Sequence, residues 1–137
     1  MQTLRPPLIS LDIETYSPHG FPEKKDDPVV SLSLAISETS RIQNGLIVIS
    51  ILFPPEKERD LLLRTREMIS MLPSGTLTTF YGSRFDLPYL LFRGNIYGVD
   101  LSQIETRLTH IDAYDIARSF PFPSYSQKKV EKELGIK

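Results

Sequence analysis

The sequence of 137 residues contains no cysteine. A disulfide-bonded scaffold and a zinc site built on thiolates are therefore excluded. The chain also lacks an excess of charge of either sign, because 16 lysines and arginines stand against 17 aspartates and glutamates, which gives a formal net charge of -1. We therefore do not expect the broad basic surface with which proteins bind duplex nucleic acid. Local binding of a short single strand through metal ions and stacking stays possible.

Long hydrophobic runs are absent as well. The longest apolar stretch covers residues 46–53, which is far too short to span a bilayer, and residues 1–7 lack the apolar core of a secretory signal peptide. We therefore expect a cytoplasmic protein that does not bind membranes. The composition is 40% hydrophobic and 24% charged, so we expect one globular domain over residues 1–137.

Strict alternation of apolar and polar residues predicts a strand over residues 8–15. One face would carry Ile9, Leu11 and Ile13, and the other Ser10, Asp12 and Glu14. Two like charges on a buried strand cost free energy unless a cation compensates them, and oxygen ligands suit Mg²⁺ or Mn²⁺. The same two acids need no ligand if this face meets solvent, and the stretch alone leaves both interpretations open.

The next segments predict a sheet that continues from this strand. Alternating residues 29–36 and β-branched residues 46–53 indicate two more strands, and Asn-Gly in the polar turn at 40–45 is typical of a hairpin. These three strands would form an antiparallel meander. Helical spacing follows at residues 56–71 and a further strand at 76–81. A strand, a helix and another strand in succession imply a crossover and parallel pairing.

The last third of the chain repeats this pattern. A helix is expected from residue 86 to about residue 95, a strand over 106–112, a short helix or loop over 112–120, and a helix over 125–134 that Gly135 ends. The predicted fold class is therefore α/β, with a mixed sheet of three antiparallel strands followed by parallel strands and flanked by helices.

Asp86 begins the helix that follows the fourth strand. If that strand lies parallel to the first one, Asp86 comes close to Asp12 and Glu14. The three carboxylates would then converge at the strand ends, where open α/β sheets place their sites.

The same segments resemble a known family. Residues 11–15, Leu-Asp-Ile-Glu-Thr, resemble the first motif of DEDD-type 3′-5′ exonucleases. Residues 81–90, Tyr-Gly-Ser-Arg-Phe-Asp-Leu-Pro-Tyr-Leu, resemble the second motif, in the version of family-B DNA polymerase proofreading domains and related stand-alone exonucleases. Residues 110–115 and 124–135 resemble the segments that follow these motifs in the family.

The resemblance implies an RNase H-like fold and hydrolysis of phosphodiester bonds at the 3′ end of single-stranded DNA or RNA. In such chemistry, two Mg²⁺ or Mn²⁺ ions about 4 Å apart activate water and stabilise the leaving oxygen. Carried over by position, the resemblance implies that Asp12, Glu14 and Asp86 are catalytic metal ligands. It also implies that Thr15 and Phe85 contact the single-stranded end.

Two departures from the family pattern bear on activity. The family usually has asparagine at the position of Tyr81, so a polar substrate contact is lost or replaced. The third motif, which supplies a fourth carboxylate and a tyrosine or histidine that orients the attacking water, is absent. We therefore expect a truncated gene product, a shortened form or a degenerate family member. Asp112 is expected to cap a helix rather than replace the missing acid, and His110 to be a satisfied core residue.

Three hypotheses follow. The first is a DEDD-type 3′-5′ exonuclease domain, which is an enzyme if its site is completed. The second is a non-catalytic RNase H-like module that binds nucleic-acid ends or a partner protein in a replication or repair complex. The third is a generic α/β domain, which predicts that the three acids lie far apart or face bulk solvent. If a C-terminal part is missing, exposed apolar surface favours self-association into a homo-oligomer.

Overall fold

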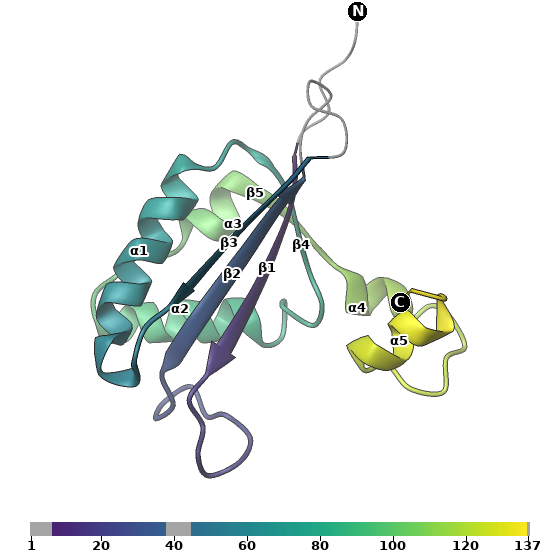
Figure 1. The fold of residues 1–137 in the computed structure, drawn as a ribbon, viewed down its shortest axis with the longest axis horizontal. Coiled ribbons are helices and arrows are strands. Elements are labelled where there is room, and N and C mark those ends of the chain that lie inside the picture. Colours follow the sequence, from purple (N-terminus) through teal and green to yellow (C-terminus); the bar gives the residue numbers. More distant parts are fainter. Residues whose placement is uncertain (1–6, 38–44, 137) are drawn as a thin grey trace, which may run out of the picture.

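The computed structural model describes residues 7–37 and 45–136. Five strands form one sheet (Figure 1). They are β1 (Leu8–Thr15), β2 (Val29–Ser37), β3 (Leu46–Leu52), β4 (Gly75–Thr79) and β5 (Leu108–Asp112). Most of the expected hairpin turn at residues 40–45 lies outside the described residues.

The strand order is β3-β2-β1-β4-β5, so β1 lies at the centre of the sheet. β2 pairs antiparallel with both β1 and β3, whereas β4 pairs parallel with both β1 and β5. The predicted mixed sheet, with an antiparallel meander followed by parallel strands, is confirmed. Because β1, β4 and β5 run in the same direction, their carboxyl ends share one edge of the sheet.

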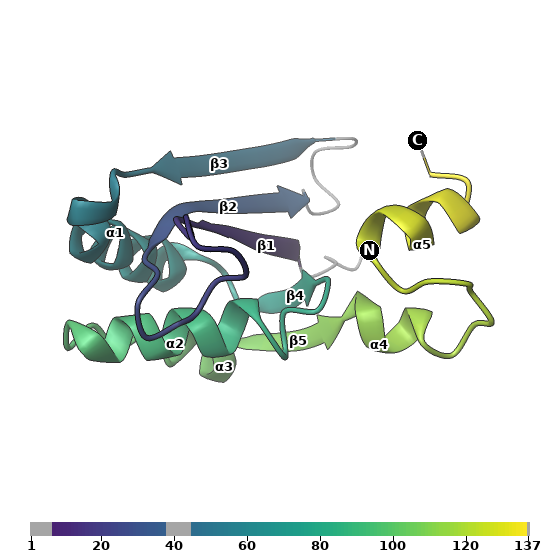
Figure 2. The same cartoon turned by 90° about the horizontal axis from the view of Figure 1, so that it is seen from below.

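Helices cover one face of this sheet and leave most of the other open (Figures 1 and 2). The helical elements are η1 (Pro55–Lys57), α1 (Glu58–Met71), α2 (Asp86–Ile96), α3 (Gln103–Arg107), α4 (Ala113–Ala117) and α5 (Gln127–Glu133). In Figure 1, α1, α2 and α3 lie together on one side of the sheet, and α4 and α5 lie apart from them on the other side. None of the described helices is both long enough and apolar enough to cross a membrane.

The hydrophobic core lies between the helices and the face of the sheet that they cover. From β1 it takes Ile9, Leu11 and Ile13, which are at most 6% exposed. α1 and α2 supply Leu61, Leu62, Ile69, Leu87 and Leu90. Burial of a Leu or Ile side chain stabilises a fold by about 1.5–3 kcal/mol. This face therefore fixes the register of β1 and directs Asp12 and Glu14 to the opposite face.

A buried ion pair between α1 and α2 adds a polar connection to this core. The side chains of Glu58 and Arg93 are 0% and 7% exposed, and Arg93 Nε donates to Glu58 Oε2 at 2.8 Å. Glu58 also accepts hydrogen bonds from the Val29 amide at 2.7 Å and from the Tyr97 hydroxyl at 3.0 Å. Glu58 therefore connects α1 to the start of β2 and to the end of α2.

Two elements differ from the sequence-based expectations. A short helix, α3, occupies part of the segment expected to be strand, so β5 begins at Leu108. Arg107 at the end of α3 donates to the carbonyl oxygens of Ile69 at 2.7 Å and Leu72 at 2.5 Å. These carbonyls lie at the end of α1, so Arg107 connects α3 to the end of that helix.

Candidate active site

Asp12 and Glu14 project from the open face of β1. Both side chains are exposed, and their partners in register on β2 are Ser33 and Ser31. The small serines leave space beside the two carboxylates. The interpretation that these acids face away from the core is therefore confirmed. The opposite face of β1 is buried in the core, but the face that carries Asp12 and Glu14 is exposed.

Asp86 reaches β1 from the start of α2. β4 pairs in parallel with Leu8 to Ser10 of β1 and ends at Thr79. The chain then passes through a turn and begins α2 at Asp86. Asp86 is 6% exposed, and its Oδ2 accepts a hydrogen bond from the amide of Ile13 at 3.3 Å. The expected approach of Asp86 to the first strand is confirmed, and its carboxylate is held against the residue that follows Asp12.

The negative charges of Asp86 and Asp12 favour binding of a cation between them. Burial, and then the negative charge of Asp12, raise the pKa of Asp86 to about 6. Among the described residues, none of the ion pairs involves Asp12, Glu14 or Asp86. Carboxylate oxygens are the ligands that Mg²⁺ and Mn²⁺ prefer, so the donor chemistry of Asp12 and Asp86 fits a hard divalent ion.

The third expected ligand is placed less favourably. Within residues 7–37 and 45–136, no three acidic or histidine side chains lie close enough together to hold a metal ion. Glu14 shares the open face of β1 with Asp12 but does not form such a group with Asp12 and Asp86. The structure thus brings together two of the three predicted acids.

Asp86 makes the free energy of unfolding depend on pH. The folded-state pKa of about 6 lies above the ordinary aspartate pKa of 3.8, so the folded state binds the proton more tightly. The stabilisation is present at low pH and is lost as the pH rises through about 6, with a loss of about 2 kcal/mol between about pH 4.5 and about pH 7. Urea unfolding in EDTA at both pH values measures this loss. The variant Asp86→Asn is expected to lack it, and an equal pH dependence of variant and wild type would contradict the assignment.

The two predicted substrate contacts are neighbours of the acids in the sequence, because Thr15 follows Glu14 and Phe85 precedes Asp86. Thr15 ends β1, and its hydroxyl lies 3.3 Å from that of Ser17. Phe85 directly precedes α2, is half-buried, and contacts the ring of Tyr89 with 5.2 Å between centroids. The ring of Phe21 lies edge-on to Phe85 at 5.9 Å.

Phe21 was missed by the sequence analysis. It lies in the loop after β1 and is 83% exposed. Two side chains of α2 hold this loop through three hydrogen bonds: the Tyr89 hydroxyl donates to the carbonyl of Asp27 at 2.7 Å, and Arg93 donates to the carbonyls of Lys24 and Lys25 at 3.1 Å. The sequence could have indicated Phe21 as a substrate contact, because it is an aromatic residue in the loop that follows the strand with Asp12 and Glu14.

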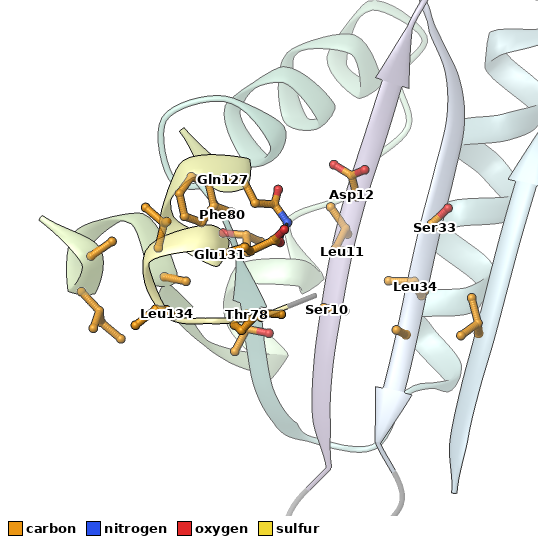
Figure 3. Close-up of a pocket in the computed structure, with 18 residues that line it drawn as sticks. Ser10, Leu11, Asp12, Ser33, Leu34, Thr78, Phe80, Gln127, Glu131 and Leu134 are labelled. Carbon is orange, nitrogen blue, oxygen red and sulfur yellow. Dashed lines mark hydrogen bonds between the residues drawn. The ribbon is translucent and has the colours of Figure 1, made fainter. Parts of the chain in front are cut away.

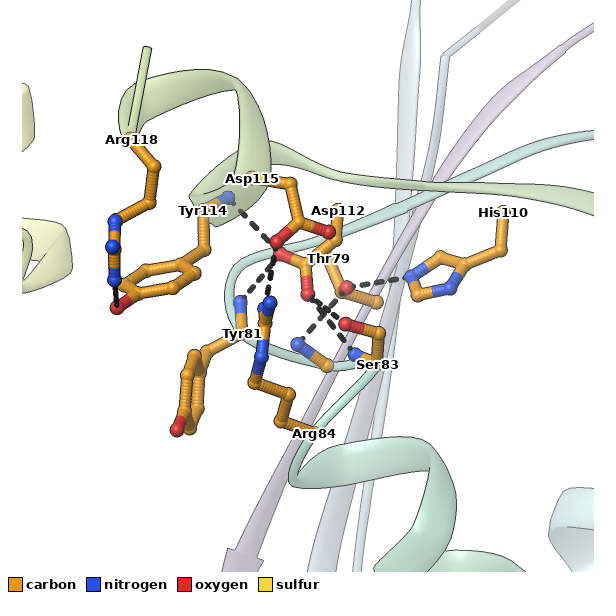
Figure 4. Close-up of polar contacts among 10 residues, drawn as sticks. Thr79, Tyr81, Ser83, Arg84, His110, Asp112, Tyr114, Asp115 and Arg118 are labelled. Atoms are coloured by element: carbon orange, nitrogen blue, oxygen red, sulfur yellow. Dashed lines mark hydrogen bonds and ion pairs between the residues drawn. The ribbon is translucent and has the colours of Figure 1, made fainter. Parts of the chain in front are cut away.

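Asp112 organises the turn that leads into α2 (Figure 4). It accepts hydrogen bonds from the amide of Tyr81 at 2.7 Å, the hydroxyl of Ser83 at 2.5 Å and the amide of Tyr114 at 3.0 Å. Burial acts to raise the pKa of Asp112, but the bonds from Ser83 and Tyr81 outweigh it and lower this pKa. The prediction that Asp112 caps a helix is confirmed. His110 Nε2 lies 2.7 Å from the Thr79 hydroxyl, as expected for a satisfied histidine.

Tyr81 has a left-handed backbone conformation, with φ of 66°. This conformation is uncommon for residues other than glycine and is tolerated best by asparagine, which the family usually has here. We expect Tyr81→Asn to be more stable than Tyr81→Ala by about 1 kcal/mol, because both lack the ring and only asparagine suits this φ. Urea unfolding of the two variants measures the difference, and equal stabilities would show that the backbone relaxes.

A groove of about 480 Å³ separates the open face of the sheet from α4 and α5 (Figure 3). Asp12 lies on the β1 side, and Gln127 and Glu131 on α5 extend toward it from the other side. Gln127 donates to Glu131 at 3.0 Å, and the buried Val130 anchors α5. Asp12 is therefore reached from solvent through this groove.

Comparison with known proteins decides the family. The family model described as "DNA polymerase family B, exonuclease domain" matches residues 2–132. The chain belongs to this family. The resemblance to DEDD-type 3′-5′ exonucleases is thereby confirmed, and the hypothesis of a generic α/β domain is wrong. The family is one of nucleases, so the chain is a 3′-5′ exonuclease-like domain.

Two polymerases are similar in sequence to this family-B exonuclease domain. The DNA polymerase delta catalytic subunit of Candida albicans is 26% identical over 105 residues, which cover 68% of this chain and 10% of the polymerase. DNA polymerase 1 of Sulfolobus acidocaldarius is 33% identical over 103 residues, which cover 62% of this chain and 11% of the polymerase. The chain thus spans about a tenth of the length of these relatives.

Solved structures show the same fold. The family B DNA polymerase of Pyrobaculum calidifontis superposes with a TM-score of 0.76 at 21% identity, over 96% of this chain and 18% of that one. E. coli exonuclease I in complex with a dT13 oligonucleotide gives a TM-score of 0.70 at 12% identity, over 97% of this chain and 36% of that one. The RNase H-like exonuclease fold predicted from the motifs is confirmed.

Proposed function

We propose that this domain hydrolyses phosphodiester bonds at the 3′ end of a single-stranded nucleic acid with Mg²⁺ or Mn²⁺. The observation that carries the proposal is the buried Asp86 carboxylate beside Asp12, which has no ion-pair partner among the described residues. Asp12 and Asp86 would hold the cation, and Glu14, which lies on the same strand face outside this pair, would become a ligand only if its side chain moved toward them. When bound, a pair of such ions supplies an activated water and stabilises the leaving oxygen.

The residues around the acids support binding of a frayed end. Thr15 and Phe85 flank the acids at the end of β1 and the start of α2, and the exposed ring of Phe21 extends the Phe85 ring outward. Aromatic faces bind unpaired bases without regard to sequence. E. coli exonuclease I, which shares the fold, has been solved with a dT13 oligonucleotide. We therefore assign the terminal nucleotide to this aromatic pair.

A non-catalytic module is the second candidate. It is favoured by the absence, from the part of the chain that the structure describes, of a group of three acidic or histidine side chains able to hold a metal ion. Such a module would bind a nucleic-acid end or a partner in a replication or repair assembly. The exposed apolar residues Leu46, Val48 and Leu52 of the edge strand β3 would favour a homo-oligomer.

Digestion of a labelled single strand separates the two candidates. A strand labelled at its 5′ end is incubated with the chain and Mn²⁺, and the products are resolved at single-nucleotide length. The enzyme hypothesis predicts a ladder that shortens progressively from the 3′ end and disappears when EDTA is added. Binding of the strand without any shortening would support the non-catalytic module, and internal cleavage would contradict both.

A further inference from the structure

Three tyrosines and two arginines gather on one surface around Asp112. This aromatic–arginine surface consists of Tyr81, Arg84, Tyr114, Arg118 and Tyr125, which come from the turn before α2, from α4 and its end, and from the segment before α5. The rings of Tyr81 and Tyr114 meet edge to face at 4.7 Å, and those of Tyr114 and Tyr125 at 6.3 Å. The family resemblance gives no role to Arg84, Tyr114, Arg118 or Tyr125, whereas Tyr81 stands where the family usually has a polar substrate contact.

Both guanidinium groups lie against these rings (Figure 4). Arg84 lies 5.2 Å from the ring centre of Tyr114 and 5.6 Å from that of Tyr81. Arg118 lies 5.8 Å from the ring centre of Tyr114 and 5.3 Å from that of Tyr125. Each guanidinium group therefore lies over two tyrosine rings and adds a positive charge to the aromatic cluster.

The two arginines differ in how their charge is balanced. Arg84 pairs with Asp115 at 2.7 Å, and both side chains are about half exposed. Arg118 donates to the hydroxyl of Tyr114 at 3.1 Å and forms no ion pair with any residue that the structure describes. Arg118 is thus the stronger candidate for binding an external anion.

Hydrogen bonds fix this surface in place. Asp112 binds the amides of both Tyr81 and Tyr114, which joins the turn before α2 to α4. The Tyr125 hydroxyl donates to the carbonyl of Phe120 at 2.7 Å. The rings therefore lose little conformational entropy when a ligand stacks on them.

The surface is hollowed, and its hollow shares one lining residue, Phe80, with the groove that contains Asp12. A hollow of about 510 Å³ is lined by Phe80, Tyr81, Tyr114, Tyr125 and Ser126. Phe80 also lines the groove between the sheet and α5 that leads to Asp12.

We propose that this aromatic–arginine surface binds the nucleotides of a single strand that lie 5′ of the terminal one. Bases stack on the tyrosine rings, and the phosphate between them binds Arg118, because unpaired bases and phosphates match rings and guanidinium groups. A net charge of -1 does not oppose this, since the positive charge is local. The inference rests on the proposed function, because it extends the path of the strand away from the acids.

Binding without metal tests this inference. Fluorescence anisotropy follows labelled oligodeoxythymidine and oligouridine of about 12 nucleotides in EDTA at low salt. Arg118→Glu is expected to weaken binding about tenfold or more and to reduce its salt dependence, whereas Arg59→Glu, on α1 at the opposite face, changes it about twofold at most. Tyr125→Leu is expected to weaken binding about fivefold or more, whereas Tyr125→Phe, which keeps the ring, retains most of it.

The inference is overturned if Arg118→Glu and Arg59→Glu weaken binding equally, or if wild type binds neither strand. Either oligonucleotide as the tighter ligand supports it and identifies the nucleic acid. Because EDTA removes the metal, the result does not depend on hydrolysis. Binding that requires Arg118 without any digestion would overturn the proposed activity alone, and digestion with binding independent of Arg118 would overturn this surface alone.

Discussion

Replacing Asp12 with alanine is expected to reduce metal-dependent digestion of a single strand by at least about 10³-fold. The variant removes the exposed member of the carboxylate pair, and a metal ion contributes several kcal/mol of charge stabilisation in the transition state. Each 1.4 kcal/mol lost from that stabilisation lowers the rate about tenfold. Single-turnover digestion with excess protein and Mn²⁺ measures the rate directly.

The fold of the Asp12→Ala variant should be intact. Asp12 is exposed, and its negative charge raises the pKa of the buried Asp86, so removing that charge relieves repulsion in the folded state. Its melting temperature without metal is therefore expected to equal or exceed that of wild type. Asp60→Ala, which removes an exposed acid from α1, is the matched control and should digest at the wild-type rate. Digestion by Asp12→Ala within tenfold of wild type would contradict the assignment of Asp12 as a ligand.

Glu58→Gln is expected to lower the free energy of unfolding by about 3–5 kcal/mol. It keeps the volume of the side chain but leaves the buried guanidinium of Arg93 without a counter-charge, which is the costly way to break an internal ion pair. Glu58 also receives hydrogen bonds from Val29 and Tyr97, so the start of β2 and the end of α2 lose a charged acceptor. Urea unfolding monitored by circular dichroism measures the change.

The control for Glu58→Gln lies on the same helix. Glu67 pairs with Arg64 at 3.1 Å, but the two side chains are 63% and 60% exposed. Glu67→Gln is therefore expected to change the free energy of unfolding by less than about 1 kcal/mol. Equal effects of the two substitutions would show that water reaches Glu58 and that the pair does not hold α1 to α2.

The fold was predictable because the sheet buries one face. Alternation in β1 determines which side chains enter the core, and a shift of one residue would reverse both faces. The parallel pairing of β4 follows from the intervening helix, and this pairing predicts that Asp86 lies beside β1. The sheet order and one side of the candidate site thus follow from local patterns and connection rules.

Contacts between distant residues were not predictable in the same way. Glu58 and Arg93 are 35 positions apart, and each alone resembles a solvated charge on a helix surface. The positive φ of Tyr81 depends on Asp112, which is held in place by the next strand. Phe21 becomes a candidate substrate contact only because the fold places its ring against that of Phe85. These features require the folded arrangement, because periodicity within one segment contains no information about them.

The most direct test of the central claim is a calorimetric titration of Mn²⁺ into wild type and Asp86→Asn at neutral pH. Asparagine keeps the acceptor for the Ile13 amide, so the variant isolates the charge of Asp86. We expect saturable binding by wild type and binding at least about tenfold weaker in the variant, since one carboxylate ligand loses its charge. Equal affinities, or no binding by wild type, would contradict the claim that Asp12 and Asp86 form a metal site.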